Sequence, residues 1–279
     1  MKIKKVLFSL FLGITLLSLS SCFKIDNWDE PNSAFRGTVY DVYTGAPLLA
    51  SQNDWEIRIW ERSWHGIEGG AVDHQVLRIK QDGTYQDVKL FDGTYDMYPY
   101  NGPFWPDVDT VKNVALKGSH TQDFTVRPYL QIVDFTTELD GVNLTLKFKV
   151  KAPLLRNDNV LPGRDPVLPD LYDVRFFISF NQFCGAGFNS NIDFDHWHSM
   201  ARNGQRQPRQ PITNFISETA TGYGRPGNGV DTTGEFELGP VELRGGHKYY
   251  VRVGANVNLG DRKYNYSDIR EIDLRHISP

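Results

Sequence analysis

Apolar and polar residues alternate with a period of two along several short stretches of this chain. The clearest stretch is 143–151 (NLTLKFKVK), in which polar or charged residues separate Leu144, Leu146, Phe148 and Val150. Successive side chains of a β-strand point to opposite faces of its sheet. The alternation therefore predicts a strand with one face in a hydrophobic core and the other in solvent.

Similar alternation predicts further strands in both halves of the chain. Asp82-Gly83 and Asp92-Gly93, each followed by Thr-Tyr, are turn signals at a strand-and-turn spacing. Many short strands with such turns, and no long helical periodicity, favour an all-β fold made of β-sandwiches. The alternating apolar residues are Trp55, Ile57, Ile59, Leu77 and Ile79 in the first half, and Val174, Phe176, Ile178, Phe180, Tyr249, Val251 and Val253 in the second.

The N-terminus has the layout of a secretory signal. Lys2, Lys4 and Lys5 precede an apolar run from Val6 to Leu19, and two small serines follow it. The run is shorter than the ~20 apolar residues that a membrane-spanning helix needs. We therefore expect residues 1–21 to be a cleaved signal peptide.

Leu19-Ser20-Ser21-Cys22 resembles the lipobox of bacterial lipoproteins, in which the chain is cut before the cysteine and the thiol carries lipid. The alternative is an ordinary signal whose Cys22 happens to lie near the cut. The acidic segment 22–32 resembles the tether of outer-surface lipoproteins in glycan-foraging Gram-negative bacteria. These resemblances imply a protein anchored in the outer membrane through Cys22 and facing the cell exterior.

Without the signal, enough chain remains for two ordinary domains. We expect one sandwich over 33–127 and a second over 128–279, with long loop excursions at 152–171 and 185–234. Loss of the three N-terminal lysines changes the net charge from −4 to −7, and no basic cluster is present. Nucleic acid is therefore excluded as a partner. If Cys22 carries lipid, Cys184 is left without a cysteine partner, so no intrachain disulfide is expected.

Each half resembles a known module. The segments 37–41 (GTVYD), 44–48 (TGAPL) and 82–85 (DGTY) resemble the carboxypeptidase-regulatory, prealbumin-like sandwich. The segment 243–255 resembles a fibronectin type III-like sandwich, in which Tyr249 would be the corner tyrosine that bonds to upstream backbone. With the lipobox, this order of modules resembles an uncharacterised family of surface lipoproteins associated with SusC/SusD-type glycan-uptake systems. The resemblance implies no catalytic residue.

The chain lacks the usual catalytic motifs, namely G-x-S-x-G, H-E-x-x-H and the P-loop. Cys184 could be a nucleophile with His196 or His198 as its base, but a small buried apolar residue is the simpler interpretation. In the segment 193–198 (DFDHWH) the two aspartates and the two histidines would point to opposite sides of a strand, and a third protein ligand for zinc is missing. We predict no cofactor, no metal site and no enzyme activity.

Aromatic side chains in solvent are the candidates for ligand binding, because sugar rings stack on flat aromatic faces while polar neighbours bond the hydroxyls. Trp60 has the parity of Glu56 and Arg58, so alternation predicts that it faces solvent while Trp55 is buried. Each candidate could instead fill a core or pad the contact between the domains. The candidates are Trp60, Trp64, Tyr100, Trp105 and Trp197, of which Tyr100 and Trp105 also suit the domain contact.

Three functions agree with these patterns. The first is a non-catalytic surface lipoprotein that binds a polysaccharide or oligosaccharide for an uptake system. The second is a structural or assembly subunit whose aromatic residues contact the uptake transporter. The third, least favoured, is a glycan hydrolase, because two carboxylates can cleave a glycan without any sequence motif.

Overall fold

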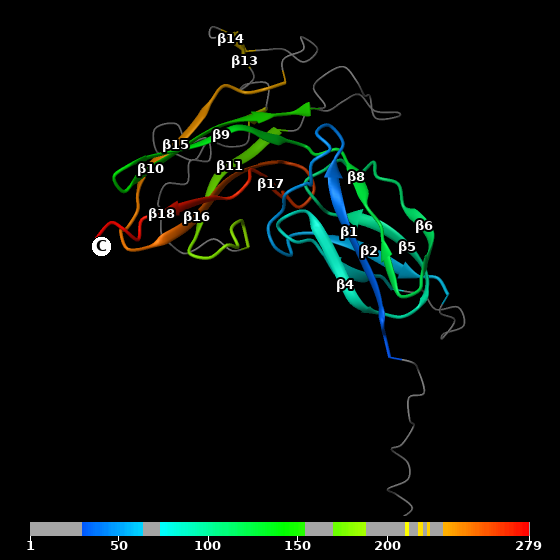
Figure 1. Ribbon diagram of the computed structural model, residues 1–279. Helices are drawn as coiled ribbons and strands as arrows, with labels where there is room; N and C mark the ends of the chain where they lie inside the picture. Colours follow the sequence, from blue (N-terminus) through cyan, green and yellow to red (C-terminus); the bar gives the residue numbers. More distant parts are fainter. Residues whose placement is uncertain are drawn as a thin grey trace, which may run out of the picture. The chain divides into compact units, whose positions relative to one another are not determined.

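The computed structural model describes residues 30–63, 73–153, 170–187 and 231–278, together with the backbone of short strands between residues 210 and 223. The described chain contains β-strands and no α-helix, so the predicted all-β fold is confirmed (Figure 1). Residues 32–279 form one compact unit. Within that unit the strands build two sandwiches, each with a hydrophobic core of its own.

The first sandwich packs two sheets against each other. One sheet has the order β4-β1-β7, with β8 also paired to β1, and the other has the order β3-β2-β5-β6. β1 runs parallel to β7 and β8, and the remaining pairs are antiparallel. These strands are β1 (Ser33–Asp41), β2 (Glu56–Glu61), β3 (Gln75–Arg78), β4 (Thr84–Leu90), β5 (Gly93–Tyr100), β6 (Val111–Leu116), β7 (Ser119–Thr121) and β8 (Phe124–Val126).

Two turns of the first sandwich, at Gly45 and at the predicted Asp82-Gly83, contain glycines with positive φ values. Gly45 has a φ of +68° and donates its N–H to Asp41 O at 2.8 Å, which turns the chain after β1. Gly83, with a φ of +80°, lies so close that an added Cβ would be 2.7 Å from Leu48 O. Glycine is favoured at both positions because a side chain is disfavoured at such φ values.

The second sandwich also has two sheets. β15-β10-β9 form one, and β12-β11-β16-β17, with β18 also paired to β16, form the other. β13 and β14 pair separately with each other. These strands are β9 (Gln131–Asp140), β10 (Asn143–Lys151), β11 (Asp170–Ser179), β12 (Gln210–Pro211), β13 (Ser217–Thr219), β14 (Gly222–Tyr223), β15 (Phe236–Glu242), β16 (Lys248–Val257), β17 (Asn265–Tyr266) and β18 (Arg270–Asp273).

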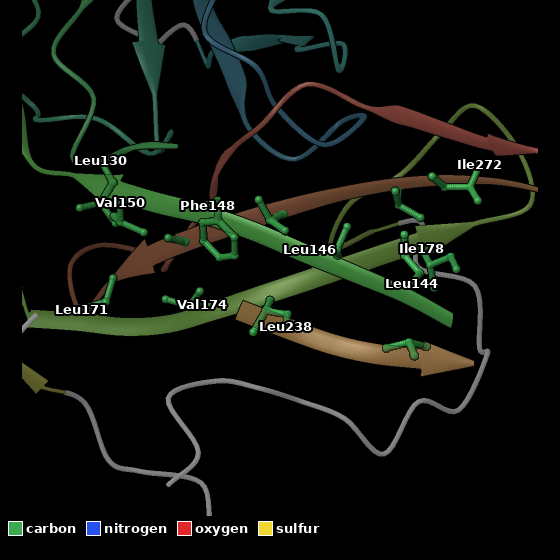
Figure 2. Packing of buried hydrophobic residues seen from close by; sticks show 14 of the residues in the cluster. Leu130, Leu144, Leu146, Phe148, Val150, Leu171, Val174, Ile178, Leu238 and Ile272 are labelled. Atoms are coloured by element: carbon green, nitrogen blue, oxygen red, sulfur yellow. The ribbon is translucent and has the colours of Figure 1, made fainter. Parts of the chain in front are cut away.

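The core of the second sandwich confirms the alternation in β10. Leu144, Leu146, Phe148 and Val150 are at most 1% exposed and point toward the residues of β11 (Figure 2). The corner tyrosine is confirmed as well. The Tyr249 hydroxyl donates to Arg244 O and accepts from the Arg244 N–H, each at 3.0 Å.

The alternation predicted for β11 is only partly right. Val174 and Ile178 are buried as expected, but Phe180 lies beyond the end of the strand and is 51% exposed. Phe177, which has the opposite parity, is fully buried in a separate cluster with Cys184, Tyr264 and Tyr266. β11 is therefore covered on both faces, and a period of two does not describe such a strand.

Arg252 lies at the junction of the two sandwiches and is 1% exposed. Its Nη1 donates to Ala50 O of the first sandwich at 2.8 Å and to Cys184 O at 3.2 Å. Its Nε and Nη2 donate to Ser267 O at 3.1 and 2.7 Å, and the guanidinium carbon lies 4.0 Å from the centre of the Tyr266 ring. Burial lowers the pKa of Arg252 to about 10, so the side chain remains a cation at neutral pH.

A second contact between the sandwiches is made by Asn265, which is 3% exposed. Its Nδ2 donates to Pro103 O at 3.0 Å, and its Oδ1 accepts from the Leu130 N–H at 3.1 Å. Trp105 lies in the same region and packs edge-on against Tyr129, with 5.2 Å between the ring centres. Both rings belong to the core of the second sandwich.

We predict that Arg252→Met destabilises the whole described unit. The substitution removes every donor to three buried carbonyl oxygens, and each such loss costs roughly 1–3 kcal/mol. The free energy of unfolding in guanidinium chloride should therefore fall by ~3 kcal/mol or more. Arg270→Met is the control, because Arg270 is an exposed arginine paired with Asp268. Equal stabilities of the two variants would show that the Arg252 contacts contribute little.

Candidate functional site

The outer side of the β3-β2-β5-β6 sheet gathers the aromatic and charged residues of the first sandwich. Ile57 and Ile59 fill the core, so the residues between them face the other way. Residues directly opposite each other in neighbouring strands point to the same side. The pairing therefore defines an outer face made of Glu56, Arg58 and Trp60 of β2, Tyr100, Tyr98 and Asp96 opposite them on β5, and Arg78 and Val76 on β3.

Three aromatic rings lie on this outer face. Tyr100 is 37% exposed, while Trp60 and Tyr98 are half-buried. The rings of Tyr98 and Tyr100 are 6.5 Å apart with their planes at 52°, and Trp60 is tilted by 51° against His74 at 5.9 Å. The face thus offers several rings in a tilted arrangement.

Glu56 orders the arginines at one end of the outer face. Its Oε1 accepts from Arg58 Nε at 2.9 Å and its Oε2 accepts from Arg78 Nη1 at 2.8 Å. The Arg58 guanidinium carbon lies 3.3 Å from the centre of the Tyr100 ring, which is a cation–π contact. One carboxylate therefore holds two cations, and one of these cations supports an aromatic ring.

Asp96 has the corresponding role at the other end. It is 8% exposed, and it accepts a bond from Arg62 Nε at 2.7 Å and from the Asn113 N–H at 2.9 Å. Burial alone would raise the pKa of Asp96, but these two hydrogen bonds lower it below the usual value. A carboxyl group held in its ionised form is unsuited to be a general acid, which needs a raised pKa.

The structure separates the predicted ligand-binding residues. Trp60 and Tyr100 lie on the outer face. The prediction of Trp105 as a ligand-binding residue is corrected, because Trp105 is 7% exposed and packs at the domain contact, as the alternative interpretation required. Trp64 and Trp197 lie outside the described residues, as do Cys22 and the segment 193–198.

Four residues of the site were missed from the sequence. Tyr98, Asp96 and Arg78 follow from the strand parities of Tyr100 and Glu56 only once the pairing partners are known. Arg62 lies one residue beyond the end of β2, but its N–H still donates to Thr94 O of β5 at 2.6 Å. The chain therefore remains extended there, and the Arg62 side chain points to the same side as Trp60. Strand parity could have predicted which side of its own strand each side chain faces. It could not predict that β3, β2 and β5 are neighbours in one sheet.

The comparisons with known proteins concern both parts of the described unit. Residues 33–127 match the model of the N-terminal domain of DUF3823, a family of unknown function. The first sandwich is therefore similar to the N-terminal domain of DUF3823 proteins. No curated protein matches the chain.

Solved structures resemble the chain over both sandwiches. A DUF3823 family protein from Bacteroides uniformis has a TM-score of 0.63 and 21% identity, and one from Parabacteroides merdae has a TM-score of 0.55 and 20% identity. A third protein, from Bacteroides uniformis, is described as a candidate carbohydrate binding protein and has a TM-score of 0.60 and 21% identity. Each match covers 88% of this chain and 100% of the other. At these identities the matches show a shared fold.

Cys184 of the second sandwich is a buried apolar residue rather than an active thiol. It is 1% exposed, and its Sγ donates to Tyr250 O at 3.4 Å. Burial raises the pKa of Cys184 to about 12. The reactive form of cysteine is the thiolate, so a thiol in this environment is a poor nucleophile at neutral pH.

The described residues contain neither a cluster of metal ligands nor a membrane-spanning helix. No three His, Cys, Asp or Glu side chains are grouped so that they could hold a metal ion. No helix there has the length and apolar character needed to cross a membrane.

We predict that Cys184 resists alkylation in the folded protein. A pKa near 12 leaves a thiolate fraction ~10³-fold smaller at neutral pH than for a free cysteine. In a Cys22→Ser variant, Cys184 is the sole thiol, so iodoacetamide labelling followed by mass spectrometry reports on it alone. Labelling should be slow in buffer and fast in denaturant. Fast labelling of the folded chain would restore the thiol as a candidate nucleophile.

Proposed function

We propose that this chain is a non-catalytic surface lipoprotein that binds a polysaccharide or oligosaccharide on the outer face of the first sandwich. The observation that carries the proposal is the presence of three aromatic rings, Trp60, Tyr98 and Tyr100, on one side of a sheet. Guanidinium groups lie among them and can bond sugar hydroxyls. The description of the Bacteroides uniformis neighbour as a candidate carbohydrate binding protein supports this ligand class.

The tilt of the rings favours a single glycan chain as the ligand. A crystalline polysaccharide presents a flat surface, which would require coplanar rings. Tyr98 and Tyr100 differ by 52° in orientation. Rings at such angles suit successive sugars of one twisted, soluble chain.

The charges of the outer face argue for binding without cleavage. Its two carboxylates, Glu56 and Asp96, are both held by arginines. Glycoside hydrolysis needs one carboxyl group that is protonated before the reaction. The lowered pKa of Asp96 opposes that role.

The cellular setting is part of the proposal. A lipid on Cys22 would hold the protein in the outer membrane, with the sandwiches facing the exterior. The bound glycan would then be close to an uptake transporter of the SusC/SusD type. This setting rests on the lipobox and on the acidic tether.

The double substitution Trp60→Ala/Tyr100→Ala tests the binding face. We expect the dissociation constant for the bound glycan to rise roughly tenfold or more, because each stacked ring contributes about 1 kcal/mol. Affinity electrophoresis of the mature chain through gels containing soluble glycans measures this change. The melting temperature should change little, because neither ring belongs to a hydrophobic core.

Tyr43→Ala is the matched control, since Tyr43 is 38% exposed and does not lie on the outer face. The control should bind like the wild type. Undiminished binding by the double variant would remove the outer face as the site. A large fall in its melting temperature would instead show that the rings are structural.

The anchor has its own test. We predict that Cys22 of protein from its native host carries lipid and is the first residue, as mass spectrometry of the N-terminal peptide would show. A Cys22→Ser variant should leave the membrane fraction. An unmodified Cys22 with residues 1–21 still attached would contradict the anchor without affecting the proposed binding face.

A further inference from the structure

We infer that the outer face binds an acidic glycan, a polymer of uronic acids, and that Arg58, Arg62 and Arg78 bind its carboxylates. The inference rests on the proposed function and names the ligand class of the same site. It comes from the charges of the face, whereas the proposed function comes from its rings.

The outer face carries more positive than negative charge, although the whole chain is acidic. Three guanidinium groups share two carboxylates, because Glu56 serves both Arg58 and Arg78 while Asp96 serves Arg62. At the rim, Lys112 of β6 acts on Asp96, and Asp73 lies next to His74. Asp107 acts on Tyr98 and pairs with Arg127. The two rim cations, Lys112 and Arg127, therefore balance the two rim carboxylates. The three arginines and the two carboxylates of the face then leave an excess of one positive charge.

The three arginines keep donors for a ligand. Each guanidinium has five N–H groups. Their side-chain hydrogen bonds with other described residues use Nε of Arg58, Nε of Arg62 and one Nη of Arg78. The side chains of Arg62 and Arg78 are 50% and 54% exposed. A planar carboxylate fits the remaining fork of N–H groups through two parallel hydrogen bonds.

The positions of the arginines suit a polymer with an acid group on every sugar. Arg58 and Arg62 have the parity of Trp60 and lie two residues to either side of it. At a rise of about 3.3 Å per residue, the two arginines are about 13 Å apart along the strand direction. A sugar stacked on Trp60 would therefore have a guanidinium group on each side along the chain. Neutral sugars would leave these cations without partners.

The test compares two polymers that differ only in charge. Isothermal titration of the mature chain with polygalacturonate and with its methyl ester changes the carboxylates and keeps the sugar backbone. We expect the acid to bind at least tenfold more tightly than the ester. That preference should shrink as NaCl rises from about 0.05 M to about 0.5 M, because salt screens exposed charges. Alginate, a second polyuronate, should also bind.

Arg62→Gln and Arg78→Gln should each weaken binding of the acid roughly tenfold, which is the expected effect of losing a charged hydrogen bond. Arg270→Gln is the matched control, since its side chain is also 50% exposed and paired with a carboxylate. It should bind like the wild type. Circular dichroism checks that the variants are folded, and the comparison of acid with ester needs no variant.

Each other outcome has a distinct meaning. Equal binding of the acid and its ester, or binding of neutral glycans alone, would overturn the inference and leave the proposed function standing. Binding of a sulfated polymer without any polyuronate would overturn the assignment to carboxylates. Failure to bind every glycan would overturn the proposed function together with the inference.

Discussion

A buried cation that has no carboxylate partner among the described residues joins the two sandwiches. Arg252 donates to backbone carbonyls, of which Ala50 O belongs to the first sandwich and Ser267 O to the second, and it stacks on Tyr266. A guanidinium can bond several acceptors in one plane, which a lysine cannot. Since desolvation of a charge is costly, the junction is stable only while all of these acceptors are in place. Burial of Arg252 of β16 therefore requires that the segment of the first sandwich around Ala50 is folded.

The closed junction explains which aromatic rings remain for a ligand. Trp105 follows β5 in the chain and packs against Tyr129, so it belongs to the core of the second sandwich. Tyr100, five residues earlier, is at the end of β5 and stays exposed under Arg58. The same aromatic and Pro-rich segment thus serves both the domain contact and the outer face. The packing of Trp105 fixes one end of the segment and so restricts the position of Tyr100.

Strand parity explains how much of this structure was predictable. It placed Trp55 in the core and Trp60 outside, and it identified β10 completely, because each of these strands has one buried face. It failed for Phe177 and could not predict the burial of Arg252, because β11 and β16 are covered on both faces. What covers the second face is decided by residues far away in the sequence, such as Ala50 and Tyr264. The outer face could be predicted only in part for the same reason. Parity oriented Trp60, whereas the positions of Tyr98 and Arg78 beside β2 follow from the strand pairing.

The ion pairs of the outer face have a consequence for its chemistry. Glu56 and Asp96 are 9% and 8% exposed, so each carboxylate needs its arginine partners to remain charged at so little exposure. In return, the carboxylates orient the guanidinium planes of the arginines while leaving other N–H groups free of described partners. An arginine that is already oriented loses less conformational entropy when a ligand binds. A face built from rings and oriented cations is therefore organised before its ligand arrives, which is expected of a binding protein, and it needs no moving part within the sheet.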